Sequence, residues 1–302
     1  MRSIPGVVDV AVFRGAEARA DAAPDLLIEV PHGATRTEDF AALEAQLTSP
    51  LPASLVDFFH VNTDAGAPEL AAAVARRFIL AHPARIAAVL CARIPRTFID
   101  CNRRVDASPE AFAAGGVTPG LMPWITTAED RARLLGLYDA YVGAFRGAAR
   151  GALPAGALLL LHTYAPRDVG VEVDANIVQS LRAAYQPEVE PTWPLRPEVD
   201  VIGRDLDGRD WSPAPVVDRL RALLAEVGVT LAHGATYPLH ASTLAHGHVM
   251  EWPGRALCVE VRRDLLAEPF EPFAQMRIGV EKTERLAGAL SGAMGTFFES
   301  GG

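Results

Sequence analysis

Cysteine is scarce in this chain. The 302 residues include only three cysteines, Cys91, Cys101 and Cys258. So few cysteines, so widely spaced, exclude a disulfide framework and a zinc site built from thiolates. Cys91 and Cys258 lie in apolar segments, where cysteine behaves as a small hydrophobic residue. We therefore expect these two side chains to be buried in the core.

Long apolar segments are also missing. The longest, residues 151–161 (GALPAGALLLL), contains a proline and is too short to cross a bilayer. The first 15 residues do not combine a basic segment, an apolar core and a cleavage site, all of which a secretory leader needs. These absences predict a cytoplasmic protein that has no membrane partner.

Positive charge is in deficit over the whole chain. There are 28 lysines and arginines against 37 acidic residues, a net charge of −9, so we expect no general affinity for nucleic acid. Against this background, Arg93, Arg96, Arg103 and Arg104 fall within twelve residues. Such a cluster indicates either a site for a small anionic ligand or a solvated basic loop.

Short apolar strands alternate with amphipathic helices along the chain, without internal repeats. The expected strands cover residues 26–31, 84–92, 96–100, 156–162, 199–203, 227–232 and 256–266. The expected helices cover residues 39–47, 68–80, 128–150, 174–185, 214–227 and 280–298. Residues 107–124 and 233–249 are expected to be loops. This alternation predicts one α/β domain over residues 1–302, with a twisted, mixed, mostly parallel sheet and helices on both faces.

Polar side chains stand at the ends of these strands. His32 follows the strand at 26–31, and His162 ends the strand at 156–162. Ligands of such sheets bind outside the carboxyl ends of the strands, where an imidazole could hold a metal or simply bond to backbone. Arg96 precedes the pair Asn102-Arg103, and arginine's planar donor fork suits carboxylates and oxyanions. We predict that these stretches form one site.

Two carboxylates have open interpretations. Glu260 lies between two valines of a late strand, where burial costs several kcal/mol (roughly, from ion desolvation) unless the group is paired or protonated. Facing a cleft, it would suit a general base; on an edge strand, it could be solvated. Asp64 lies in the approach to the helix at 68–80 and could act there only in local turn or capping chemistry.

The order of these motifs resembles the N-formylglutamate amidohydrolase family, a relative of the zinc carboxypeptidases and aspartoacylase-type deacylases. The resemblance runs from about residue 26 to 265, and RTFIDCNR is its most specific part. The stretches that carry it are VPHGA (30–34), the Asp of NTDAGAPEL (62–70), RTFIDCNR (96–103), LLLLHTY (158–164) and ALCVEVRRDLL (256–266).

The resemblance implies a zinc carboxypeptidase-like fold and a Zn²⁺ cofactor bound by His32, His162 and one carboxylate. Wider relatives carry a glutamate three residues after the first histidine, but this chain has Thr35 there. Glu38 and Asp64 are the alternatives. We favour Asp64, because an aspartate at this point of the chain, followed by a helix, is part of the resemblance.

The resemblance also implies roles in hydrolysis. Arg96 would polarise the scissile carbonyl, and Asn102 with Arg103 would hold the carboxylate of the substrate. Glu260 would be the base that activates water and then protonates the leaving amine. Tyr237, in the loop at 233–249, could donate to the oxyanion or the leaving group. His240 and His246 in that loop could line the pocket or be structural, and the role of His248 stays open.

The implied reaction is hydrolysis of an N-acyl acidic amino acid, with N-formyl-L-glutamate giving formate and glutamate during histidine breakdown. Another acylated amino acid or a short peptide is an alternative substrate, since specificity lies in loops. A non-catalytic binding protein on the same fold is the second alternative, and Thr35 is the feature that suggests it. The sequence leaves the acyl group and the oligomeric state open.

Overall fold

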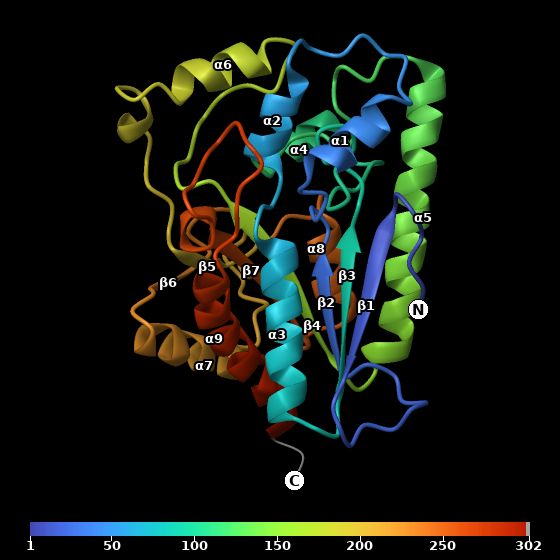
Figure 1. The fold of residues 1–302 in the computed structure, drawn as a ribbon, viewed down its shortest axis with the longest axis vertical. Coiled ribbons are helices and arrows are strands. Elements are labelled where there is room, and N and C mark those ends of the chain that lie inside the picture. The colour runs from blue at the N-terminus through green and yellow to red at the C-terminus, as the bar shows by residue number, and fades with distance from the viewer. Residues whose placement is uncertain (300–302) are drawn as a thin grey trace.

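One mixed sheet of seven strands runs through the molecule. The computed structural model describes residues 1–299, and the sheet order is β1-β3-β2-β4-β7-β5-β6 (Figure 1). Among the strand pairs of the described chain, β1/β3 and β5/β7 are antiparallel and the others are parallel. The strands are Val8–Arg14 (β1), Leu26–Val30 (β2), Ile86–Ala92 (β3), Ala157–Tyr164 (β4), Val199–Val201 (β5), Leu231–His233 (β6) and Ala256–Arg262 (β7).

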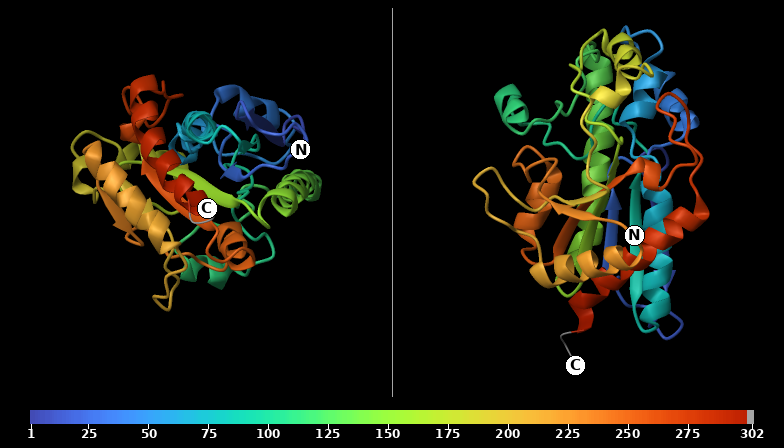
Figure 2. Two further views of the ribbon diagram at one scale, coloured as in Figure 1. Left: turned by 90° about the horizontal axis from the view of Figure 1, so that it is seen from below. Right: turned by 90° about the vertical axis from the view of Figure 1, so that its left-hand side faces the viewer.

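Helices cover both faces of this sheet. α3, α7 and α9 pack on one face, and α5 and α8 lie on the other (Figure 2). The α-helices are Thr37–Glu44 (α1), Leu55–Asn62 (α2), Ala67–Ala81 (α3), Pro109–Ala114 (α4), Ala128–Ala152 (α5), Ile177–Ala184 (α6), Ala214–Glu226 (α7), Leu244–Glu251 (α8) and Val280–Glu299 (α9). The predicted mixed α/β sheet with two covered faces is confirmed.

The central strands β2, β3 and β4 are buried along their whole length. Their mostly apolar sequences, interrupted by Glu29 in β2 and by the polar end of β4, follow from this position, because strands covered on both faces need no polar side. Successive residues of β2 enter different cores: Leu26 and Ile28 pack with α3 and α9, whereas Leu27 packs on the other face. Cys91, Cys101 and Cys258 are buried, which confirms the expectation for Cys91 and Cys258.

The longest helix, α5, starts where the sequence signals it. The side chain of Thr127 accepts a hydrogen bond from the backbone N–H of Asp130, and acidic residues occupy the first turn, where they complement the helix dipole. Among the helices that the structure describes, none is long and apolar enough to span a bilayer.

Several local predictions are wrong. Residues 96–100 form no strand; turns begin after β3, with backbone bonds from Phe98 and Ile99 to the Pro95 carbonyl. The loop predicted at 233–249 contains most of α8, which Thr243 caps through the N–H of His246. The loop predicted at 107–124 contains α4. The strand β1 and the helix α2 were not predicted.

Candidate metal centre and substrate cavity

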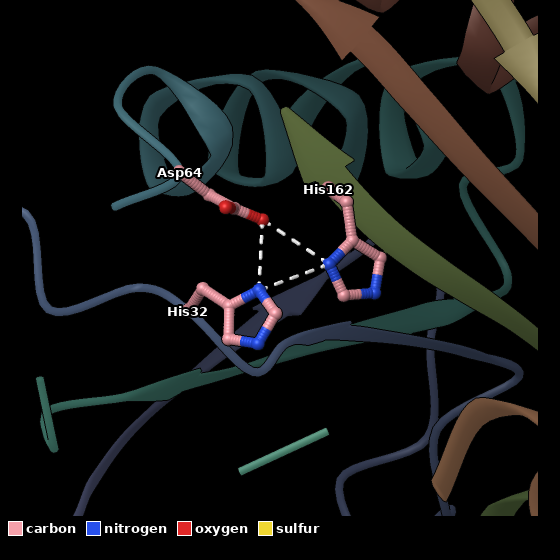
Figure 3. Close-up of side chains that lie close together, drawn as sticks. All are labelled: His32, Asp64 and His162. Atoms are coloured by element: carbon pink, nitrogen blue, oxygen red, sulfur yellow. Dashed lines mark hydrogen bonds and ion pairs between the residues drawn. The ribbon is translucent and has the colours of Figure 1, made fainter. Parts of the chain in front are cut away.

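Two histidines and one aspartate meet at the carboxyl end of the central strands. His32 lies two residues after β2, His162 lies within β4, and Asp64 occupies the turn between α2 and α3 (Figure 3). Oδ2 of Asp64 is 3.2 Å from Nδ1 of His32 and 3.1 Å from Nδ1 of His162. The two Nδ1 atoms are 3.3 Å apart. All three residues are at most 3% exposed.

The protonation of His32 shows why this cluster fits a metal cation. Nε2 of His32 lies 2.7 Å from Oδ1 of Asp100, whose carboxylate only accepts, so the Nε2 proton belongs to that bond. Nδ1 of a neutral His32 then points a lone pair at the carboxylate of Asp64. Two acceptors facing each other repel, and a cation between them removes the repulsion. Two histidines and one carboxylate form a common catalytic zinc donor set.

Asp64 supplies the negative charge of this centre. Burial alone would raise the pKa of its carboxyl, but the positive charge of His32 and His162 when these rings are protonated, and the bonds they then donate, hold that pKa well below its usual range. The N–H of Thr163 donates to Oδ2 at 3.2 Å. Within residues 1–299, Oδ1 has no hydrogen-bond partner although it is buried. The absence of a partner for this buried oxygen is a second observation that suits a cation.

Asp100 supports the centre from behind, and sequence reasoning assigned it no role. Besides His32, its fully buried carboxylate accepts from the N–H of Asn102 at 2.8 Å and from Nη2 of Arg96 at 2.9 Å. Burial opposes ionisation of Asp100, but Arg103, His32 and Arg96 keep its pKa well below the usual range. A carboxylate on the remote nitrogen of a ligating histidine fixes the tautomer and the ring orientation. Its position inside RTFIDCNR was the available signal.

Arg96 approaches the centre from the same turn. Its Nη1 donates to the carbonyl of Asn62 at 3.2 Å and lies 3.6 Å from Oδ1 of Asp64. The side chain lines a cavity of about 410 Å³ beside the centre and stays partly exposed there. A guanidinium in this place can donate to an oxyanion that develops in the cavity.

Asn102 and Arg103 line the same cavity. Oδ1 of Asn102 accepts from the N–H of Ala245 at 3.0 Å, and this bond ties the turn to the start of α8. Arg103 is almost fully buried, and its Nε donates to the carbonyl of Thr118 at 3.2 Å. Both residues are therefore held rigidly at the cavity wall.

Glu260 lies opposite His162 in the register of β7 against β4. It lines the cavity, and among the described residues nothing bonds its buried Oε2. Burial is the main cause that raises the pKa of its carboxyl to about 7; the positive charges of His162, Arg196 and Arg96 oppose the rise, and Asp64 adds to it. A carboxyl with this pKa exchanges a proton readily near neutral pH.

Tyr237 also lines the cavity, on a loop that Asp200 positions. Asp200 pairs opposite Glu260 in the sheet, and its carboxylate accepts from the N–H groups of Ala235 and Thr236. Sequence reasoning missed Asp200, and it missed Arg196, which enters the cavity from a proline-rich connector.

Some predicted residues lie away from the centre. Glu38 is exposed on α1, whereas the alternative, Asp64, lies between the two histidines. His240 bonds Ser242, and His248 packs against Phe145. Neither they nor the histidine at 246 belong to the residues, within 1–299, that line the cavity.

Comparison with known proteins relates this chain to a protein family. The sequence model of the N-formylglutamate amidohydrolase family matches residues 24–267, which confirms the resemblance drawn from the motifs. A comparison with curated proteins finds no match.

Two solved structures share the fold across nearly the whole chain. One is an N-formylglutamate amidohydrolase from Ralstonia eutropha JMP134, at 18% identity and a TM-score of 0.56, with 96% of each chain covered. The other is a gene product of Agrobacterium tumefaciens, at 18% identity and a TM-score of 0.54, with 97% of this chain and 95% of that one covered.

Proposed function

Because the chain belongs to the N-formylglutamate amidohydrolase family, we propose that it hydrolyses the amide bond of a small N-acyl acidic amino acid. N-formyl-L-glutamate is the proposed substrate and zinc the proposed cofactor. We treat residues 1–302 as one catalytic domain. The observation that carries the proposal is the buried cluster of His32, Asp64 and His162, whose two histidines line one cavity together with Glu260. A role in histidine breakdown and a cytoplasmic location stay predictions.

The three clustered residues would hold the metal. A bound divalent ion acts as a Lewis acid and lowers the pKa of water from about 15.7 to roughly 7. Asp100 would keep Nδ1 of His32 turned toward the ion through its bond to Nε2. Wider relatives carry a glutamate ligand at the position of Thr35. This chain does not need one there, because Asp64 already brings a carboxylate between the histidines.

Glu260 is the proposed proton carrier. Its free, buried Oε2 faces the same cavity as His162, and no described cation bonds it directly. It would take a proton from the attacking water and return it to the nitrogen of the leaving amino acid. Positioned acid–base groups of this kind contribute about 10²- to 10⁴-fold in rate.

Arg96, Arg103 and the carboxamide of Asn102 have the remaining proposed roles, which are to stabilise the oxyanion and to bind the substrate. Arg96 would donate to the carbonyl oxygen as negative charge develops on it, and loss of such a donor costs about 10²- to 10³-fold in rate. Asn102 and Arg103 would hold the α-carboxylate next to the scissile nitrogen. Tyr237 would close the cavity over the substrate from the opposite loop.

Metal content and one variant test this proposal together. Purified protein should bind about one zinc ion, a chelator should abolish formate release from N-formyl-L-glutamate, and added zinc should restore it. Glu260→Gln should keep the metal but lose at least about 10²-fold in kcat. Glu251→Gln, at an exposed position on α8, is the matched control and should keep full activity.

A protein that binds no divalent metal, or a Glu260→Gln variant that is as active as the parent, would refute the mechanism. Stoichiometric metal without hydrolysis of any N-acyl amino acid would instead favour the non-catalytic binding protein.

A further inference from the structure

Besides Arg96 and Arg103, the cavity is lined by arginines from outside the RTFIDCNR turn, and Arg196 is one of them. Arg196 belongs to the connector between α6 and β5, and it lines the cavity together with Glu260 and Tyr237. Its backbone is fixed at both ends of the residue. The N–H donates to the carbonyl of Pro166 at 2.9 Å, and its own carbonyl accepts from Nη1 of Arg262 at 2.9 Å. The side chain therefore starts from a rigid base.

Two tyrosine rings hold the guanidinium of Arg196. Its Cζ lies 5.3 Å from the ring centre of Tyr164 and 5.5 Å from that of Tyr237. Contacts of a guanidinium with aromatic faces stabilise the charge and restrict the side chain. Nη2 donates to Oδ1 of Asp168 at 2.6 Å. The planar donor fork is thus set in place before any ligand arrives.

Most donors of this fork remain available, because the side chain bonds only Asp168 among the described residues. Nε of Arg196 is buried, yet no acceptor within residues 1–299 bonds it. Only 13% of the Arg196 side chain is exposed, whereas its partner Asp168 is 58% exposed. A buried charged donor without an acceptor is costly, and a ligand oxygen in the cavity would remove that cost. A carboxylate is the ligand that matches an arginine fork.

Within residues 1–299, four other arginines line the cavity, and each donates to acceptors of the protein. Arg167 and Arg263 donate to backbone carbonyls. Among the described residues, Nε of Arg263 and of Arg96 is also buried without an acceptor, so the tyrosine contacts and the separate segment distinguish Arg196.

Arg96 and Arg103 both lie within 3.6 Å of the Asp100 carboxylate, which in turn bonds the metal ligand His32. Their charge is therefore tied to the metal centre, where the acyl group and the adjacent α-carboxylate must lie. Arg196 comes from a separate segment and is not among the groups bonded to Asp100.

We propose that Arg196, clamped between Tyr164 and Tyr237, binds the side-chain carboxylate of the substrate and so selects acidic over neutral amino acids. This inference rests on the proposed amidohydrolase function and assigns its second anionic subsite. A substrate with two carboxylates then meets two separate cationic contacts: Asn102 with Arg103 for the α-carboxylate, and Arg196 for the side chain.

A pair of isosteric substrates isolates this subsite. N-formyl-L-glutamate and N-formyl-L-glutamine have the same shape and differ only at the side-chain terminus, which is a carboxylate in one and a neutral amide in the other. We expect the parent protein to favour the glutamate substrate in kcat/KM, and Arg196→Gln to lower that ratio about 10- to 100-fold, as loss of a charged hydrogen bond implies. The kcat/KM for the glutamine substrate should change less than about threefold.

Two further variants control for folding and for arginine loss in general. Arg196→Lys keeps the charge but loses the fork, so its ratio should fall between those of the parent and Arg196→Gln. Arg209→Gln removes an exposed arginine that also stacks on an aromatic ring, that of Trp211, and it should leave the ratio unchanged. Should Arg196→Gln fail to fold, the ratio for Arg196→Lys decides.

The outcomes distinguish a failure of the subsite assignment from a failure of the proposed function. An equal loss of kcat/KM on both substrates in the Arg196 variants would mean that the arginine does not discriminate between the substrate side chains. That result would overturn this inference alone. The same holds if the parent hydrolyses both substrates equally well. A parent inactive on every N-formyl amino acid would overturn the proposed function, and the subsite assignment with it.

Discussion

Replacement of Asp100 by asparagine tests how the centre is supported. The change keeps the size of the side chain and removes its negative charge. In the parent, one carboxylate oxygen faces Nε2 of His32 at 2.7 Å and the other faces Nη2 of Arg96 at 2.9 Å. An asparagine can still accept from His32, but its amide nitrogen then points a donor at the donor of Arg96.

Both stability and metal affinity should fall. Loss of one partner from a buried charged network costs about 3–5 kcal/mol; Arg96 is partly solvated, so we expect about 3 kcal/mol. For 302 residues, typical unfolding entropies convert this loss into a fall in melting temperature of about 5 °C. A weakened carboxylate–histidine contact should lower zinc affinity about 10- to 100-fold.

Thermal melting of the metal-free protein and zinc titration against a competing chelator measure the two effects separately. Asp106→Asn is the matched control, because Asp106 pairs with Arg104 at the surface of the same segment, and neither quantity should change there. An Asp100→Asn variant that melts and binds zinc like the parent would refute the supporting role of this carboxylate.

Two other predictions concern buried residues in β2 and shortly after it. Burial raises the pKa of the Glu29 carboxyl to about 7, although Tyr141 donates a hydrogen bond to it. The protonated carboxyl therefore contributes to the stability of the fold below pH 4.5. About 3 kcal/mol of that contribution is lost as the pH rises through 7. Glu29→Gln should therefore be increasingly more stable than the parent from pH 5 to 8 in urea titrations; a constant difference would contradict this. A Cβ on Gly33 would meet Sγ of Cys91 and the carbonyl of Ala92, so Gly33→Ala should cost about 1–3 kcal/mol. Adding Cys91→Ala should restore part of that loss, and absence of any rescue in the same titrations would contradict the assigned clash.

Strands that lie in the middle of the sheet were the easiest elements to predict. The mostly apolar runs that became β2, β3 and β4 favour a position covered on both faces, although β2 contains Glu29. β1 was missed because its burial alternates irregularly along an antiparallel edge. α8 was missed because its histidines and Gly247 give no apolar stripe, although Thr243 offers a cap.

The candidate site was predictable in kind but not in its contacts. Histidines at strand ends are visible in the sequence, because a strand's end and its apolar run can both be read locally. The choice between Glu38 and Asp64 cannot be read in that way. It depends on α2 and on the turn before α3, which bring Asp64 within 3.2 Å of a histidine 32 residues away. α2 itself was not predicted.

The strand that was wrongly predicted at residues 96–100 shows that the apolar pattern of the sequence does not include the contacts of its charged residues. Thr97, Phe98, Ile99 and Asp100 are all completely buried, and the residues of the central strands are buried too, so burial does not distinguish this segment from a strand. The chain turns here instead, and Phe98 and Ile99 enter the core while Asp100 meets His32 and the arginines. The charges of this segment, more than its apolar residues, therefore determine its shape, and the same turn places the proposed catalytic arginine at the cavity.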